Sequence, residues 1–231
     1  EPVDLSIYEA VYGDSENFDF KKVVAAGSME ELAEALTGSI YREPVASTLK
    51  LLENPGLIDY ETALNRFYFS NAWKEVNRLK SSLDKETILE IHGIEIDLLN
   101  MNWIYRTKAY YDVPARDISR YLIPVSHKLK PREMAAMISA KDSNEMMLFA
   151  CQTYYKKYLE PGDPSSLERA LNEQMRSINA RERKAHPYSF AVIESYIYDK
   201  RTEIERIIRI TESVRYGYDP KLILKGLNLG V

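Results

Sequence analysis

Apolar residues recur at intervals of three and four along most of the chain, which places them on one face of an α-helix. No segment alternates apolar and polar residues between turn signals for long enough to predict a strand. Ser28 with Glu31 has the form of a helix-opening capping box. The predicted fold class is all-α, a multi-lobed helical bundle in which antiparallel neighbours are joined by mostly short loops.

Helix borders are marked by capping residues and prolines. Asp59 precedes a predicted helix over 60–79, and Asp84 precedes one over 86–111. The run Pro161-Gly162-Asp163-Pro164 is the clearest break, and Ser165 then precedes a predicted helix over 167–184. Pro187 opens the next predicted helix, from 188 to about 216.

The stretch GIEIDLLNMNWIYRTKAYY, residues 93–111, carries apolar residues on two roughly opposite sides of its predicted helix. One stripe consists of Ile91, Ile94, Leu98, Met101, Tyr105 and Ala109, and the other of Ile96, Leu99, Trp103 and Tyr110. A helix with two apolar faces has to be packed on both sides. We therefore expect it to be the central helix of its lobe.

Polar residues form two stripes between these apolar faces, Asp97, Asn100 and Lys108 on one and Glu95, Asn102 and Arg106 on the other. None of them has a charged partner four residues away on this helix, so the partners are expected from other helices, a neighbouring lobe, water or another protein. Five of them are candidate inter-lobe or partner-contact residues: Glu95, Asp97, Asn100, Arg106 and Lys108. For Asp97, Asn100, Arg106 and Lys108, internal hydrogen bonding is favoured over contact with a partner.

The predicted helix after Pro187 has one broad apolar face, made of Phe190, Ile193, Tyr196, Ile197, Ile204, Ile207, Ile208, Ile210 and Val214. Charged residues lie roughly opposite: Arg201, Glu205, Arg209 and Glu212. Arg201–Glu205 and Glu205–Arg209 have the spacing of ion pairs on a helix. We interpret the charged side as a solvated face, with contact to a partner as the alternative.

An internal repeat relates the two halves of the chain. Residues 60–65 and 167–172 share Glu-x-Ala-Leu-Asn at an offset of 107 (172 − 65). Further on, Glu95-Ile96-Asp97 matches Glu203-Ile204-Glu205 at an offset of 108 (203 − 95). Each unit then continues with an aromatic helix end, an Asp, a Pro and a short predicted helix. This order of elements predicts two copies of one helical lobe.

Composition excludes several functional classes. Lysine and arginine number 31 against 35 aspartate and glutamate residues, so the formal charge is −4, which argues against a binder of nucleic acid driven by overall positive charge. No apolar run is long enough to span a bilayer, so direct membrane insertion is not expected. The single cysteine, Cys151, fits a reducing compartment. Because the first residue is Glu1, we interpret the sequence as a fragment.

Motifs of catalysis are missing from the sequence. The nine glycines form no phosphate-binding loop, and the three histidines lack metal-ligand spacing. Glu95 and Asp97 cannot act on one substrate atom, because alternate positions on a helix point about 200° apart. Cys151 lies in an apolar helical stretch and is expected to be a packed side chain. We therefore predict no catalytic residue, no metal and no cofactor.

Several of these segments resemble the C subunit of the bacterial and archaeal V/A-type rotary ATPases, the counterpart of the eukaryotic vacuolar d subunit. The matching features are Leu64-Asn65-Arg66-Phe67-Tyr68-Phe69, residues 94–100 and 103–108, Ala140-Lys141-Asp142, and Pro187 followed by 197–210. The resemblance implies an all-helical funnel of three repeated lobes. On that scheme, 1–57 is a partial first lobe, 58–130 the second and 131–231 the third. The second repeat departs from the pattern, with Ile208 in place of Asn100 and Val214 in place of Arg106.

The resemblance implies a mechanical role. Such a protein is a non-catalytic part of the central rotor and couples the central-shaft subunits of the soluble head to the membrane ring of ion-carrying subunits, for proton or sodium transport. Its expected location is cytoplasmic and peripheral, on the cytoplasmic face of the membrane. Two alternatives stay open, a helical-repeat adaptor for another complex and an all-α enzyme with an unrecognised pocket of convergent carboxylates.

Overall fold

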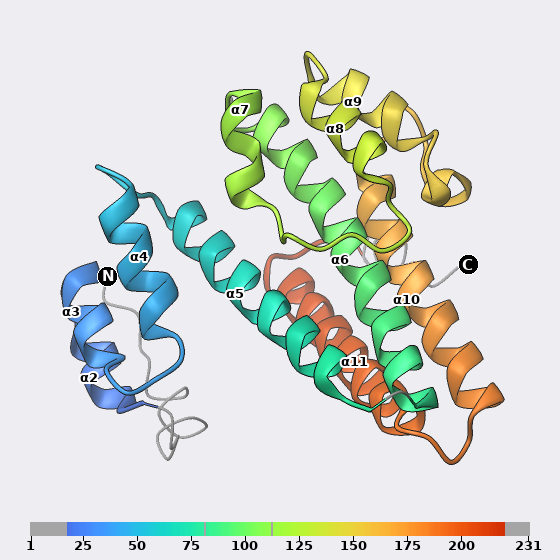
Figure 1. Ribbon diagram of the computed structural model, residues 1–231, viewed down its shortest axis with the longest axis horizontal. Helices are drawn as coiled ribbons and strands as arrows, with labels where there is room; N and C mark the ends of the chain where they lie inside the picture. The colour runs from blue at the N-terminus through green and yellow to red at the C-terminus, as the bar shows by residue number, and fades with distance from the viewer. Residues whose placement is uncertain (1–17, 81, 112, 220–231) are drawn as a thin grey trace.

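The computed structural model describes residues 18–80, 82–111 and 113–219, and this part of the chain is helical without a strand (Figure 1). The all-α prediction is thus confirmed. The helices are α2 (Phe20–Ala25), α3 (Met29–Ala35), α4 (Arg42–Leu51), α5 (Leu57–Arg78), α6 (Leu83–Ala109), α7 (Ala115–Ile118), α8 (Pro131–Ser139), α9 (Ser143–Ala150), α10 (Ser165–Ala185) and α11 (Ala191–Arg215). Two 3-10 turns, η1 (Ser119–Tyr121) and η2 (Tyr154–Tyr158), join them.

The capping residues act only in part as the sequence indicates, because four predicted helix starts differ: α10 already begins at Ser165, α11 begins at Ala191 and not at 188, and Asp59 and Asp84 are not the caps of α5 and α6. The Ser28 hydroxyl accepts from the Glu31 amide at 3.1 Å, as predicted for α3. Helix α5 begins before Asp59, which accepts instead from the Gly56 amide at 2.8 Å. Ser82 caps α6, and Asp84 accepts from the Phe190 amide at 2.8 Å where α11 begins. Both aspartates remain at helix starts, but they lie within the first turn because an earlier residue provides the cap.

Helices α2, α3 and α4 form a small N-terminal group that packs on the start of α5. The cluster between them is built on Ala33, Leu36, Val45 and Tyr60. In Figure 1 this group lies apart from the other helices, and α5 leads from it to the rest of the molecule. The cluster is separate from the main core, so α5 is the structural link between the two regions.

Helix α6 is buried on two sides, as its pattern predicts. Ile91, Ile94, Leu98 and Met101 lie in the main core with residues of α8, α9 and α10 that include Met137, Met146 and Ala170. On the other side, Ile96 lies in a second cluster with Phe69 of α5 and Ile123, and Leu99 packs against that cluster. The polar residues between these faces are therefore brought close to several other segments.

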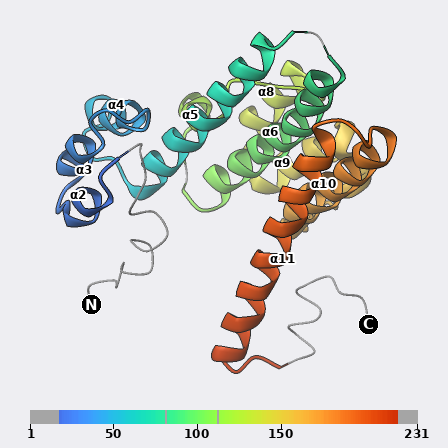
Figure 2. The ribbon, with the colours of Figure 1, turned by 90° about the horizontal axis from the view of Figure 1, so that it is seen from below.

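Helices α10 and α11 repeat the pairing of α5 and α6. The first helices of the two pairs begin 108 residues apart (165 − 57), and so do the second helices (191 − 83). Helix α10 packs against both α6 and α11, while α11 extends away from the rest of the molecule (Figure 2). The main core includes residues on both sides of position 130, so the predicted second and third lobes share one core. The lobe boundaries themselves stay a prediction.

Candidate functional site

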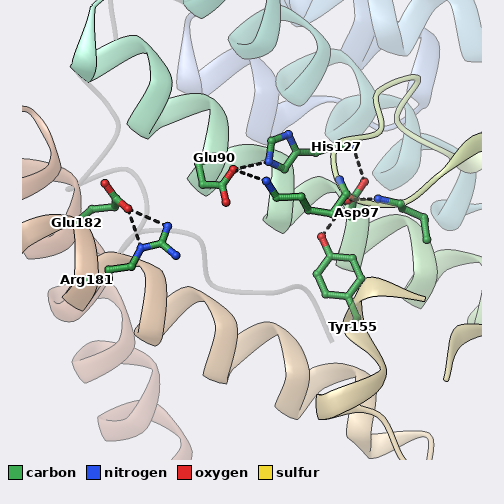
Figure 3. A network of polar contacts seen from close by, with 8 residues as sticks. Glu90, Asp97, His127, Tyr155, Arg181 and Glu182 are labelled. Atoms are coloured by element: carbon green, nitrogen blue, oxygen red, sulfur yellow. Dashed lines mark hydrogen bonds and ion pairs between the residues drawn. The ribbon is translucent and has the colours of Figure 1, made fainter. Parts of the chain in front are cut away.

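Asp97 is the most highly coordinated polar residue of α6. It is fully buried, and its Oδ1 accepts from the His127 amide at 2.9 Å. Its Oδ2 accepts from the amides of Lys128 and Leu129 at 2.7 and 2.8 Å. The Tyr155 hydroxyl also donates to Oδ2, at 2.9 Å (Figure 3). The carboxylate thus accepts from four donors, one at Oδ1 and three at Oδ2.

Asn100, one turn further along α6, fixes the preceding part of the same loop. Its Oδ1 accepts from the Ile123 amide at 2.9 Å. Its amide nitrogen donates to the carbonyls of Ile123 and Val125 at 3.0 and 3.3 Å. Asn100 is fully buried, so these contacts satisfy polar groups that water does not reach. Asp97 and Asn100 together hold the irregular segment from Ile123 to Leu129 against α6.

Tyr155 connects this loop to a segment much further along the chain. Its side chain comes from η2 and is completely buried. Burial raises the pKa of its hydroxyl, and the Asp97 carboxylate beside it raises that pKa further, so the hydroxyl keeps its proton and donates. Asp97 therefore joins three parts of the chain: α6, the loop before α8, and the turn before α10.

Glu90 holds the same loop from a second position, about two turns before Asp97 on α6. Its Oε2 lies 2.6 Å from His127 Nε2 and 2.9 Å from Lys128 Nζ (Figure 3). Burial raises the pKa of Glu90, but the hydrogen bonds from Lys128 and His127 together lower it more, and the net shift is downward. The same two loop residues are thus held by Glu90 through their side chains and by Asp97 through their backbone.

Gly93 leaves the room that this arrangement needs. A Cβ atom built there would lie 2.4 Å from Cγ of His127 and 2.7 Å from its Cβ, closer than unbonded carbons can approach. The imidazole therefore packs directly on the α6 backbone, where only glycine leaves space for it. The conformation of Gly93 is ordinary for a helix, so the requirement is one of close approach.

Lys108 binds the end of another helix. Its Nζ donates to the carbonyl of Ala140, the residue that follows the last turn of α8. Burial lowers the pKa of Lys108, while the charges of Asp142 and Glu145 oppose that shift. A cation at a helix C-terminus satisfies a carbonyl without an intrahelical partner and interacts favourably with the helix dipole. Like Asp97, Lys108 connects α6 to a segment beyond position 130.

Glu95 and Arg106 behave differently from the other candidates, because their contacts lie within α6. Glu95 Oε2 is 3.4 Å from Nδ1 of His92, an ion-pair distance without a well-aligned hydrogen bond. The guanidinium of Arg106 lies 4.7 Å from the ring centroid of Trp103, a cation–π contact. The expectation that these two residues contact another lobe or another protein stays a prediction. The sequence rule for ion pairs four residues apart does not detect the two observed contacts, because both span three residues.

This arrangement provides structure and offers no evident reaction chemistry. The carboxylate of Asp97 is buried and already accepts hydrogen bonds from four donors of the protein itself. Among the described residues, no group of histidine, cysteine and acidic side chains could hold a metal ion. Cys151 packs against the main core, and burial raises the pKa of its thiol, which disfavours the reactive thiolate. In the ranges that the structure describes, no helix has the length and apolarity needed to cross a membrane.

The sequence did not identify the partners of these candidates. Tyr155, His127 and Glu90 come from a turn, a loop and the central helix, and nothing in their spacing relates them to one another. The one local signal is Gly93, a glycine inside a long helical pattern, which often has a packing reason.

Comparisons with known proteins agree with the resemblance noted in the sequence. Residues 5–226 match the family described as ATP synthase (C/AC39) subunit. The A-type ATP synthase C subunit of Pyrococcus furiosus is 27% identical over 210 residues, covering 88% of this chain and 55% of that protein. The corresponding C subunit of Methanobrevibacter smithii is 22% identical over 209 residues, covering 85% and 53%. The chain therefore spans about half the length of these relatives. No solved structure gives a significant match.

Proposed function

The chain belongs to the ATP synthase (C/AC39) subunit family, and from this premise we propose that it is a non-catalytic part of the central rotor of a V/A-type rotary ATPase or ATP synthase. In this role it couples the central shaft of the soluble head to the membrane ring of ion-carrying subunits. The expected partners are the shaft subunits and the ring. The expected location is peripheral, on the cytoplasmic face of the membrane.

The observation that supports this role best is the internal joint at Asp97. A protein that transmits torque has to keep its segments in register under load, which requires rigid connections between helices. Asp97 accepts hydrogen bonds from four donors in two segments outside its own helix. We propose that Asp97 and Lys108 act as joints between the predicted second and third lobes and that Asn100 fixes a loop within the second, so that contacts with shaft and ring are made by exposed residues.

Co-purification of the full-length protein with the shaft and ring subunits tests this function. We expect it to bind both, and its deletion is expected to uncouple ATP hydrolysis from ion pumping in membrane vesicles. If it binds neither and pumping survives its deletion, the proposal is wrong. Recovery of an unrelated complex with no shaft or ring subunit would favour a helical-repeat adaptor.

A matched pair of variants separates the joint from a partner contact. Asp97 and Glu205 occupy equivalent positions of the two long helices (205 − 97 = 108), and Glu205 is exposed. We expect Asp97→Ala to lower the melting temperature while binding to shaft and ring changes less, and Glu205→Ala to leave the melting temperature unchanged. Unchanged melting of Asp97→Ala with lost binding would instead place Asp97 at a partner interface.

A further inference from the structure

Helix α11 is attached to the rest of the molecule along one side. The Tyr198 hydroxyl donates to the Asn172 carbonyl of α10 at 3.2 Å, and Arg209 forms an ion pair with Glu168 of α10 at 2.9 Å. Ser195, on the same side of the helix, is fully buried. On an α-helix these three positions of α11 lie within about 60° of one another. The helix extends away from the rest of the molecule (Figure 2), and its opposite side is exposed.

The exposed side of α11 carries a heptad pattern. Its positions recur at alternating intervals of four and three residues, and we call them the α11 seam: Ile193, Ile197, Lys200, Ile204, Ile207, Thr211 and Val214. The apolar members are between 53% and 65% exposed, and the two polar members are exposed as well. Alternation of this kind over about three heptads is typical of a helix that packs along its length against another helix. An exposed apolar row of this size indicates a surface that a partner covers.

The order of apolar and polar members makes the seam complementary to itself in the antiparallel direction. With the two-fold axis between Ile204 and Ile207, the facing pairs are Ile204–Ile207, Lys200–Thr211 and Ile197–Val214. Apolar residues thus face apolar residues, and the two polar residues face each other. Lys200 also forms an ion pair with Glu203 at 2.7 Å, so its charge has a partner at the edge of the seam.

The charges beside the seam favour the same direction. Glu194 follows Ile193 and Arg215 follows Val214, so both lie on the same edge of the seam. In the antiparallel register Glu194 of one helix faces Arg215 of the other, and symmetry produces this pair twice. A parallel register places no opposite charges across the seam and sets Lys200 against Lys200. Charge and apolar pattern therefore select one partner helix and one direction.

We propose that α11 is a dimerisation helix, which pairs in the antiparallel direction with α11 of a second copy of this chain. The occupant is a second copy because one surface supplies both halves of a two-fold contact, in its apolar layers and in its flanking charges. One helix from each copy makes a small interface, so the dimer is expected to dissociate with a Kd of about 1–100 μM. This inference goes beyond the proposed rotor role and does not depend on it.

A charge at the centre of the seam tests the contact. Sedimentation equilibrium of the chain at about 1–300 μM measures the dimer dissociation constant. Ile204→Lys puts a cation into the apolar centre, and we expect at least about tenfold weaker dimerisation. Ile40→Lys is the matched control, because Ile40 is also an exposed isoleucine, 63% exposed, and lies between α3 and α4. We expect the control to change the constant by less than about twofold.

An exchange of charges tests the direction. Glu194→Lys or Arg215→Glu alone places like charges opposite each other twice, and we expect about fivefold weaker dimerisation in each case. The double variant restores opposite charges across the seam, and its dimerisation should return to within about twofold of the unchanged chain. A parallel pair gives no such restoration. Circular dichroism of every variant verifies that the chains fold alike.

Each outcome decides the proposal. A dimer that Ile204→Lys weakens, that Ile40→Lys leaves intact and that the charge exchange restores supports it. A chain that stays single over the whole concentration range overturns it and assigns the seam to a contact within the chain or to another protein. Equal effects of Ile204→Lys and Ile40→Lys place the dimer contact elsewhere and also overturn it. A double charge variant as weak as the single variants rules out the antiparallel pairing.

Discussion

Helices α6 and α11 occupy equivalent places in the two helix pairs and have almost the same length, 27 and 25 residues, yet their environments are opposite. On α6, polar side chains such as Asp97 and Asn100 are buried. On α11, apolar side chains such as Ile204 and Ile207 are exposed. Residue type by itself therefore does not tell whether a position of this repeat is inside or outside. The neighbouring segments decide it.

The equivalent carboxylates, Asp97 and Glu205, make the contrast specific. Asp97 accepts from three backbone amides and one hydroxyl in the interior. Glu205 accepts from Arg201 at 3.1 Å on an exposed surface. Breaking a buried hydrogen-bonded network leaves donors without water or partner, whereas an exposed ion pair contributes little. The same charge thus has a large effect in one repeat and a small one in the other.

Replacing the two carboxylates gives the largest expected difference between the helices. Asp97→Ala orphans three buried amides and the Tyr155 hydroxyl, so we expect it to lower the free energy of unfolding by about 3–5 kcal/mol. Glu205→Ala should change it by less than about 0.5 kcal/mol. Urea denaturation followed by circular dichroism measures both. If the two variants lost similar amounts of free energy of unfolding, the buried hydrogen bonds of Asp97 would contribute no more to stability than the exposed ion pair of Glu205.

Asn100 is the next most sensitive position. Asn100→Ala leaves the Ile123 amide and two carbonyls without their partner, and we expect a loss of about 2–3 kcal/mol. Asn102→Ala, on the other polar stripe and only half-buried, is the control and should cost under about 1 kcal/mol. The same denaturation measurement applies. Hydrogen exchange should also accelerate at Ile123 in the first variant, and unchanged exchange there would contradict the anchoring role of Asn100.

Gly93→Ala tests the close approach between α6 and the loop. Alanine in place of glycine favours a helix by about 1 kcal/mol, but here the added Cβ clashes with His127, and we expect a net loss of about 1–2 kcal/mol. The double variant Gly93→Ala with His127→Ala should lose less free energy of unfolding than the two single variants lose together, because removing the imidazole relieves the clash. A thermodynamic cycle of thermal or urea unfolding measures this coupling, and strict additivity would rule out the contact as the cause.

His92 should give the smallest effect, and one that depends on pH. Its contact with Glu95 raises its pKa above the ordinary value near 6.5, against the opposing effect of burial, and Glu194 of α11 also raises it. A raised pKa stabilises the folded state at pH below about 6.5, and this contribution disappears as pH rises through the folded pKa. At about pH 5.5, the free energy of unfolding of the unchanged protein should exceed that of the His92→Gln variant by under about 1 kcal/mol. At about pH 9, this contribution of His92 should be absent. In a Glu95→Gln background, the gain at the lower pH should be smaller.

The fold class could be read from the sequence because its evidence is local. The spacing of Ile91, Ile94 and Leu98 predicts a helix wherever these residues end up, and the second stripe with Ile96 and Leu99 predicts packing on both sides. The prediction that α6 is central follows from these positions alone. Helix borders were less accurate, since Asp59 and Asp84 have the chemistry of a cap but an earlier residue holds that position.

The candidate site could be predicted only in part. The sequence identified Asp97, Asn100 and Lys108 as polar residues in need of distant partners, and each of them bonds to a segment outside its own helix. It could not name those partners. The separation between Asp97 and Tyr155 is 58 residues, and no pattern along the chain specifies that a turn after α9 folds back on α6.

What the sequence by itself determined is the helical architecture, the repeat and the two-sided nature of α6, because these depend on periodicity within one segment or on likeness between two. What only the tertiary structure decided is which polar residue is buried and what it binds. Asp97 and Glu205 carry the same charge at equivalent positions, but only Asp97 meets a loop whose amides point at it. Burial and hydrogen bonding depend on segments that are distant along the chain, and folding alone brings those together.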